Sequence, residues 1–208
     1  ALASEELLGA ARTMRMASDA GTEITYELGD YVALCQYGCA DAPGRWDHFG
    51  SALVGQVPNE GRADGVVVLA PGDMVFPFRR YLGEPVRMVV RDGYVTAIEG
   101  GFEATFLRDY YASYGDPAGY QISHLNWGLD QRARWDAIAS GTGGIGMDAR
   151  SLRGGVTFST GPNHHHGGDN HSKCHVDMAL RDCSLWLDDR LVIDAGRLVS
   201  DAAAPAAR

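Results

Sequence analysis

Residues 86–98 read Val-Arg-Met-Val-Val-Arg-Asp-Gly-Tyr-Val-Thr-Ala-Ile, and this stretch decides the fold class. Two runs rich in β-branched residues flank an Asp-Gly pair. That pair is typical of a two-residue hairpin turn, because Asp and Gly tolerate the positive φ angles that such a turn needs. We therefore predict strands over 86–90 and 94–98 that are joined at Arg91-Asp-Gly93.

Runs of the same kind recur along the chain. They predict strands at 24–28, 31–36, 66–69, 122–129, 156–159 and 174–180, and a last hairpin of 185–187 and 191–193 around Asp188-Asp189. Helical spacing is found at 4–14, with Ser4 as the expected N-cap, at 103–114 before Gly115, and at 132–139. The glycine cluster at 141–146 lacks the strand-to-helix register of a phosphate loop. Without βαβ alternation, the order predicts an α+β fold: a β-rich mixed sheet with a few helices.

The composition is that of one globular domain, which we place at 1–200, followed by a flexible tail at 201–208. A net charge of −9 is unlike the basic surface of a nucleic-acid-binding protein. With no signal peptide and no apolar run of about 18 residues, we expect a cytoplasmic protein that does not contact membranes. The chain begins without methionine, which favours a processed or truncated polypeptide. In a cytosolic protein we expect reduced thiols at all of its cysteines: Cys35, Cys39, Cys174 and Cys183.

The segment Asn170-His-Ser-Lys-Cys-His-Val-Asp-Met178 suggests a metal site. In a strand, His175 and Asp177 point to the same face, because side chains alternate. With His124 from the upstream strand they would form a 2-His-1-carboxylate set, which leaves open positions on Fe(II). The His-x-Asp spacing also arises by chance, so an ordinary strand remains the alternative.

Several other polar residues are candidates for chemistry. His48 ends a Pro-Gly loop with Arg45 and Asp47, and histidine is a residue type suited to a substrate hydrogen bond or to proton transfer near neutral pH. His166 belongs to the histidine-rich segment 163–171, which is either a plain polar loop or the lining of a metal site. Glu60 is a candidate substrate-binding carboxylate, or simply a turn acid. A serine hydrolase is not supported, since no Gly-x-Ser-x-Gly motif is present.

Six separated motifs, taken together, resemble one family. They are Gln56-Val-Pro-Asn-Glu-Gly-Arg-Ala-Asp-Gly65, Ala70-Pro-Gly-Asp73, Ile98-Glu-Gly-Gly101, Ser123-His-Leu-Asn-Trp-Gly128, Phe158-Ser-Thr-Gly-Pro162 and Cys174-His-Val-Asp-Met178. From about residue 8 to 199 the chain resembles the C-terminal part of the 2,5-dihydroxypyridine 5,6-dioxygenases, which are similar in fold to the aminopeptidase T metallopeptidases. The resemblance implies a non-haem Fe(II) enzyme that opens a hydroxylated pyridine with O₂ to N-formylmaleamic acid. It also implies iron held by His124, His175 and Asp177.

The resemblance also bears on the alternatives. The peptidases carry a glutamate where this chain has His124, and a further metal-binding histidine where it has Thr157, so a Zn or Co aminopeptidase is the second interpretation. Family members have a further N-terminal domain beyond the part matched here. That domain or a neighbouring subunit would complete the substrate pocket, so we expect a homo-oligomer. An inactive domain that serves as an assembly module is the third interpretation.

Overall fold

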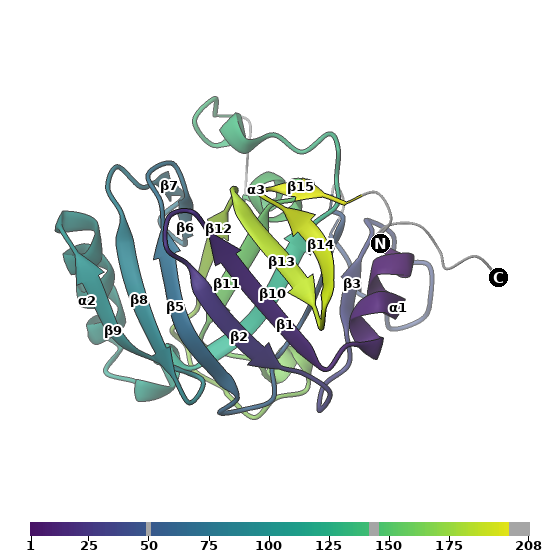
Figure 1. The fold of residues 1–208 in the computed structure, drawn as a ribbon, viewed down its shortest axis with the longest axis horizontal. Coiled ribbons are helices and arrows are strands. Elements are labelled where there is room, and N and C mark those ends of the chain that lie inside the picture. Colours follow the sequence, from purple (N-terminus) through teal and green to yellow (C-terminus); the bar gives the residue numbers. More distant parts are fainter. Residues whose placement is uncertain (49–50, 142–145, 200–208) are drawn as a thin grey trace.

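The protein is a sandwich of two β-sheets, seen in a computed structural model that describes residues 1–48, 51–141 and 146–199 (Figure 1). In this view one sheet crosses the front and the other lies behind it. The ladders between the named strands of the described residues are all antiparallel. The α+β class of the prediction is confirmed, as a β-rich fold with few helices.

The front sheet has eight strands. Their spatial order is β15 (Arg197–Leu198), β14 (Arg190–Asp194), β13 (Cys183–Leu187), β1 (Thr13–Ser18), β2 (Glu23–Glu27), β5 (Ala63–Leu69), β8 (Val86–Arg91) and β9 (Tyr94–Gly100).

The rear sheet has seven strands. Their order is β3 (Leu34–Gln36), β4 (Leu53–Gln56), β10 (Ile122–Gly128), β11 (Val156–Thr160), β12 (Val176–Leu180), β6 (Met74–Phe76) and β7 (Arg80–Tyr81).

Helices lie at the margins of the sandwich. In Figure 1, α1 (Leu2–Ala10) is on the side of β3, whereas α2 (Phe102–Tyr114) runs along β9 at the opposite edge. The remaining helical pieces are α3 (Met147–Ser151) and the 3-10 turns η1 (Pro117–Tyr120), η2 (Trp135–Ala137) and η3 (His164–His166). No helix in the described residues is long and apolar enough to cross a membrane.

The main hydrophobic core fills the space between the sheets. Both sheets contribute alternate residues, because every second side chain of a strand points to the same face. The buried residues of this core include Met14, Met16, Ile24, Tyr26, Val67 and Met88 from the front sheet, and Val54, Leu125, Trp127, Phe158 and Met178 from the rear sheet. The inner face of the rear sheet is therefore apolar, and its polar residues are left for the outer face.

The locally encoded elements agree with the sequence. The hairpin of β8 and β9 turns at Asp92 and Gly93, both with positive φ (48° and 74°). α2 ends at Gly115 in the left-handed conformation (φ 59°), as predicted. The last hairpin, β13 to β14, also forms, and Asp188 has a φ of 50°.

Three predicted elements were wrong in extent or type. The helix predicted for 4–14 ends at Ala10, and Ser4 lies buried inside it instead of capping it. Residues 13–18 instead form β1, which pairs with β2 and β13 and buries Met14 and Met16 in the main core. The strand predicted at 31–36 is confined to β3, and the helix predicted at 132–139 is only the turn η2. Tertiary pairing overrides weak local helix preference at such places.

Two predictions concern residues that the structure does not describe. The tail at 201–208 lies outside the described residues, as does most of the glycine-rich loop at 141–146. The assignment of 1–200 to one metal-binding catalytic domain stays a prediction.

Candidate metal centre

Three neighbouring strands of the rear sheet form the floor of the candidate site. His124 lies on β10 just before Leu125 and Trp127, which are buried in the main core and so face away from it. Asp177 on β12 likewise alternates with Val176 and Met178, which are also core residues. His124 and Asp177 therefore point to the outer face of the sheet, with β11 between their strands.

An irregularity in β10 sets the position of His124. The β10–β11 register shifts between Ile122 and Leu125, which is the mark of a β-bulge. Bulges bend a strand and redirect a side chain, and they are common beside active sites. Ser123, within the irregularity, donates a hydrogen bond to the carbonyl of Pro162 (2.5 Å) and so ties β10 to the loop after β11.

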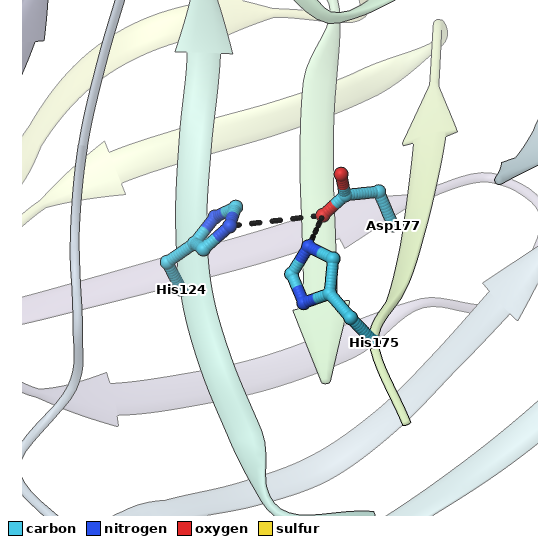
Figure 2. A group of neighbouring side chains, drawn as sticks. All are labelled: His124, His175 and Asp177. Carbon is cyan, nitrogen blue, oxygen red and sulfur yellow. Dashed lines mark ion pairs between the residues drawn. The ribbon is translucent and has the colours of Figure 1, made fainter. Parts of the chain in front are cut away.

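The side chains of His124, His175 and Asp177 converge on one point, as Figure 2 shows. One donor atom from each lies within 4.8 Å of the other two. The Nε2 atoms of His124 and His175 are 3.6 Å and 3.3 Å from Oδ1 of Asp177. Adjacent ligands that are each about 2.1 Å from a shared ion would lie about 3 Å apart, so the spacing fits a metal ion.

His175 lies just outside the strand that carries Asp177. The strand was predicted from residue 174, but β12 starts at Val176, so His175 precedes it. Its imidazole nevertheless reaches the same carboxylate oxygen as His124 does. The two-residue separation still brings His175 and Asp177 together.

His124 is in the protonation state that metal binding needs. Burial, opposed in part by the Asp177 carboxylate, lowers the pKa of His124 to about 3. The imidazole is thus neutral near pH 7, and a neutral imidazole is the form that ligates metals. The Nδ1 atoms of His124 and His175 are buried without a hydrogen-bond partner in the described part of the chain.

Asp177 is held as a carboxylate. Burial by itself would raise its pKa, but the hydrogen bond from His175 and the charge of Arg150 outweigh burial and keep the pKa well below the ordinary value. Nη2 of Arg150 lies 2.7 Å from Oδ2 of Asp177, and Ser159 donates a hydrogen bond to Oδ1 (2.5 Å). Two neutral imidazoles with one carboxylate are a donor set suited to Fe(II).

Among the other candidates, His166 is the one brought beside the triad. Its ring is 5.5 Å from that of His124, edge to face. Burial, reinforced by the neighbouring His165 and His175, lowers the pKa of His166. A neutral imidazole beside His124 can accept a proton.

Glu60 is exposed and contacts the histidine-rich loop instead of the triad. Its Oε1 accepts hydrogen bonds from the Asn163 side chain (3.1 Å) and from the backbone of Asp169 (3.3 Å). These residues flank His166 in sequence. In this structure, Glu60 therefore helps to fix the loop that carries His166.

His48 lies at the end of a loop organised by Asp47. The Asp47 carboxylate accepts hydrogen bonds from the backbone of Tyr37 and His48 and from the Arg45 guanidinium. The His48 ring packs edge-on against Trp46, 4.4 Å between centroids. Within the described residues, the ring contact and hydrogen bond of His48 are with Trp46 and Asp47 and not with the triad.

Two buried polar groups share the outer face with the triad. Asn126 follows His124 by two residues and pairs in register with Thr157 on β11. Oδ1 of Asn126 and Oγ1 of Thr157 are buried without a hydrogen-bond partner in the described part of the chain. Thr157 stands where the peptidases were expected to carry a metal-binding histidine, and a hydroxyl is a poor substitute for it.

Sequence reasoning missed Arg150 and Ser159. Ser159 lies on the strand predicted at 156–159, but its position directly opposite Asp177 follows from the register of β11 with β12, which the sequence does not specify. Arg150 gave no signal in the sequence, since it comes from α3 after a glycine-rich connection. Cys174, which precedes His175, is fully buried in the main core and outside the triad, as expected of a residue that is not a ligand.

Comparisons with known proteins agree on one family. The family model described as NicX, 2,5-dihydroxypyridine 5,6-dioxygenase, matches residues 1–200. A 2,5-dihydroxypyridine 5,6-dioxygenase from Pseudomonas putida KT2440 is 45% identical over 201 residues. A solved structure of 2,5-dihydroxypyridine dioxygenase from the same organism superimposes with a TM-score of 0.93 at 44% identity, over 96% of this chain.

A more distant structure shows the fold alone. AmpT from Thermus thermophilus superimposes with a TM-score of 0.67 at 16% identity, covering 94% of this chain and 52% of that one. This chain spans 57% of the length of the curated Pseudomonas relative and 58% of the solved one.

Proposed function

The chain belongs to the 2,5-dihydroxypyridine 5,6-dioxygenase family, and on that premise we propose that it is the metal-binding part of a ring-opening dioxygenase. Its substrates would be O₂ and a small hydroxylated pyridine, and its product from 2,5-dihydroxypyridine would be N-formylmaleamic acid. The observation that carries the proposal is the convergence of His124, His175 and Asp177 on one point.

The proposed metal is Fe(II), held by these three residues. When bound there, the ion would supply the redox chemistry that lets O₂ react with the aromatic ring. Neutral His124 and ionised Asp177 already have the protonation states that a ligand needs. Both are fixed to adjacent parts of one sheet, so little reorganisation accompanies binding.

The remaining chemistry of the chain is proton transfer and orientation. Ring hydroxyls lose protons as the ring opens, so the site needs an acceptor near the triad. We propose His166 for that role, which is supported by its ring contact with His124 and by the burial that lowers its pKa and keeps the imidazole neutral. We assign His48 to a substrate hydrogen bond or second proton transfer, with its loop held by Asp47. Glu60 acts through the loop that carries His166.

The metallopeptidase alternative has less support. Two-metal hydrolysis needs ligands for a second ion. Among the described residues, His124, His175 and Asp177 are the one set of three or more metal-ligating side chains that converge. Thr157, at the position of the extra peptidase histidine, offers only a hydroxyl.

The alternative of an inactive assembly module is supported by the length of this chain compared with that of the Pseudomonas relative. The matched part covers 57% of the Pseudomonas relative, so the remainder of that protein is available to complete a pocket. A neighbouring subunit could contribute in the same way, and a cytoplasmic homo-oligomer is part of the proposal.

Metal analysis of anaerobically purified protein tests this assignment. We expect one iron per chain in the wild type and loss of tight binding in His124→Ala, His175→Ala and Asp177→Ala, because each removes one of three donors. Cys174→Ser is the matched control and should keep its iron. Two zinc ions per chain, or iron lost in Cys174→Ser and retained in His124→Ala, would refute the assignment.

A further inference from the structure

The two carboxylate oxygens of Asp177 have different surroundings. Oδ1 faces the imidazoles of His124 and His175, at 3.6 Å and 3.3 Å. Oδ2 is instead bound by Arg150, whose Nη2 lies 2.7 Å away. Arginine forms short charge-assisted hydrogen bonds with carboxylates and remains charged under all ordinary conditions.

The Arg150 guanidinium is itself held in place. It stacks on the ring of Phe76, with 4.3 Å from the guanidinium carbon to the ring centroid, and its side chain is 19% exposed. Phe76 is on β6, the strand that pairs with β12, and its partner in register is Asp177. The guanidinium is thus fixed over the neighbour of the carboxylate that it binds.

Helix α3 can approach Phe76 because its N-cap is glycine. Gly146 has a φ of 84°, and a Cβ there would lie 2.1 Å from the Phe76 ring. Ala149 of the same helix packs in a small second core with Phe76 and Ala179. These contacts fix the backbone from which the Arg150 side chain extends, and stacking on Phe76 fixes its guanidinium.

From this geometry we propose that Arg150 is a positioning residue that makes Asp177 a one-atom ligand. By engaging Oδ2, Arg150 leaves only Oδ1 for the metal. Ser159, which lies opposite Asp177 on the paired strand β11, donates a hydrogen bond to Oδ1 and helps to hold that oxygen in place. Carboxylates bind metals through one oxygen or through both. The contact of Arg150 with Oδ2 is the physical cause that would restrict Asp177 to one oxygen.

One-atom ligation by Asp177 determines how many coordination positions on the bound ion stay open. Three single donor atoms leave three positions of an octahedral ion, enough for O₂ and two substrate atoms. A two-atom carboxylate would occupy one of them. The inference rests on the ligand set proposed above, but it concerns ion binding only and does not require dioxygenase activity.

The test counts water molecules on a bound ion. Mn(II) is loaded into the full chain, and water-proton relaxation reports how many exchanging waters the ion carries. We compare wild type, Arg150→Gln, Arg150→Lys and the control Arg132→Gln at equal loading; Arg132 has a side chain that is 94% exposed. A thermal melt of each metal-free protein shows that it is folded.

We expect one fewer water in Arg150→Gln, because Oδ2 becomes free to bind the ion. Arg150→Lys should retain the wild-type count, since an ammonium can still engage Oδ2, and Arg132→Gln should also match the wild type. A purely packing role for Arg150 would alter the melting temperature and leave the water count unchanged. An unchanged count in folded Arg150→Gln overturns the inference while the proposed ligand set stands.

A second measurement covers the case in which Arg150→Gln does not fold. A crystal structure of the Mn(II)-loaded wild type should show Oδ1 of Asp177 on the ion and Oδ2 on Arg150. Both oxygens on the ion would overturn the inference. Absence of any Mn(II) or Fe(II) binding by the wild type would refute the ligand set and the inference together.

Discussion

Asp73 is a buried carboxylate away from the triad, and it makes stability depend on pH. Burial raises its pKa to about 6, although hydrogen bonds from the backbone of Ala70 and Arg181 partly oppose the rise. Between pH 4 and 6 the folded state keeps the proton that the unfolded chain releases. Raising the pH through this window therefore removes stability, by up to about 3 kcal/mol.

We predict that Asp73→Asn gains stability relative to the wild type as the pH rises from 4 to 7. The amide cannot ionise, so it avoids the cost of burying a charge. Urea unfolding of both proteins across that range measures the difference in unfolding free energy, which separates Asp73 from the other acids. A difference that stays constant with pH would rule out the raised pKa.

The cysteines provide a second prediction for single residues. All four thiols are free, as expected from the sequence, and only Cys39 is exposed. Burial raises the pKa of Cys35 and Cys174 to about 11 and that of Cys183 to about 12. Because thiolates are the reactive form, a thiol reagent should modify one group rapidly in the native protein and four in denaturant without reductant. Fewer than four in denaturant would indicate a disulfide.

Helix α3 provides the prediction at the scale of an element. Gly146→Ala adds a methyl group against Phe76 at a positive φ, so we expect α3 to shift and stability to fall by about 2 kcal/mol. The matched control is Gly141→Ala, which has a φ of 72° and no atom within 4 Å of the added Cβ. Differential scanning calorimetry of the two variants separates the clash from the backbone cost. Equal melting temperatures would show that α3 tolerates the shift.

The elements that the sequence predicted well are those with a local cause. The turn at Asp92 and Gly93 needs only its own residues, and the end of α2 needs only Gly115. The first helix was extended too far because residues 13–18 become a strand through partners that include β13, about 170 residues later. No local pattern contains that pairing.

The contacts of the candidate site likewise include some that the sequence predicts and some that depend on the tertiary structure. His175 and Asp177 are two residues apart, so strand alternation alone predicted that they point together. His124 was added as a second imidazole from an upstream strand, and the family resemblance supported that choice; nothing local specifies that β10 lies two strands from β12. Arg150 was beyond prediction because its contact with Asp177 depends on how α3 packs against Phe76.

At the scale of the whole molecule, the two faces of the rear sheet have different roles. The inner face of the rear sheet belongs to the main core, whereas the triad lies on the outer face, which also carries the small second core of Phe76, Ala149 and Ala179. Pockets for small molecules commonly lie between domains. The remaining length of the Pseudomonas relative is thus the natural source of a cover for this face.

We predict that the 208-residue chain binds Fe(II) but turns over 2,5-dihydroxypyridine at least about a hundredfold more slowly than the full-length Pseudomonas relative. The reason is positioning, because small losses of substrate alignment have costs of that size. Oxygen uptake and loss of substrate absorbance, at equal iron loading, provide the comparison. Equal rates would mean that the short chain already holds a complete pocket.

The central strand β11 lies between the two strands that carry the triad (Figure 2). An ion shared by His124 and Asp177 would crosslink β10 to β12 across β11, so these strands could not separate until the ion left. At a free metal concentration one hundred times the dissociation constant, such binding raises the free energy of unfolding by about 2.7 kcal/mol. If the ion is the proposed Fe(II), iron supply would govern how long each molecule survives proteolysis, and a cell short of iron would clear this protein faster.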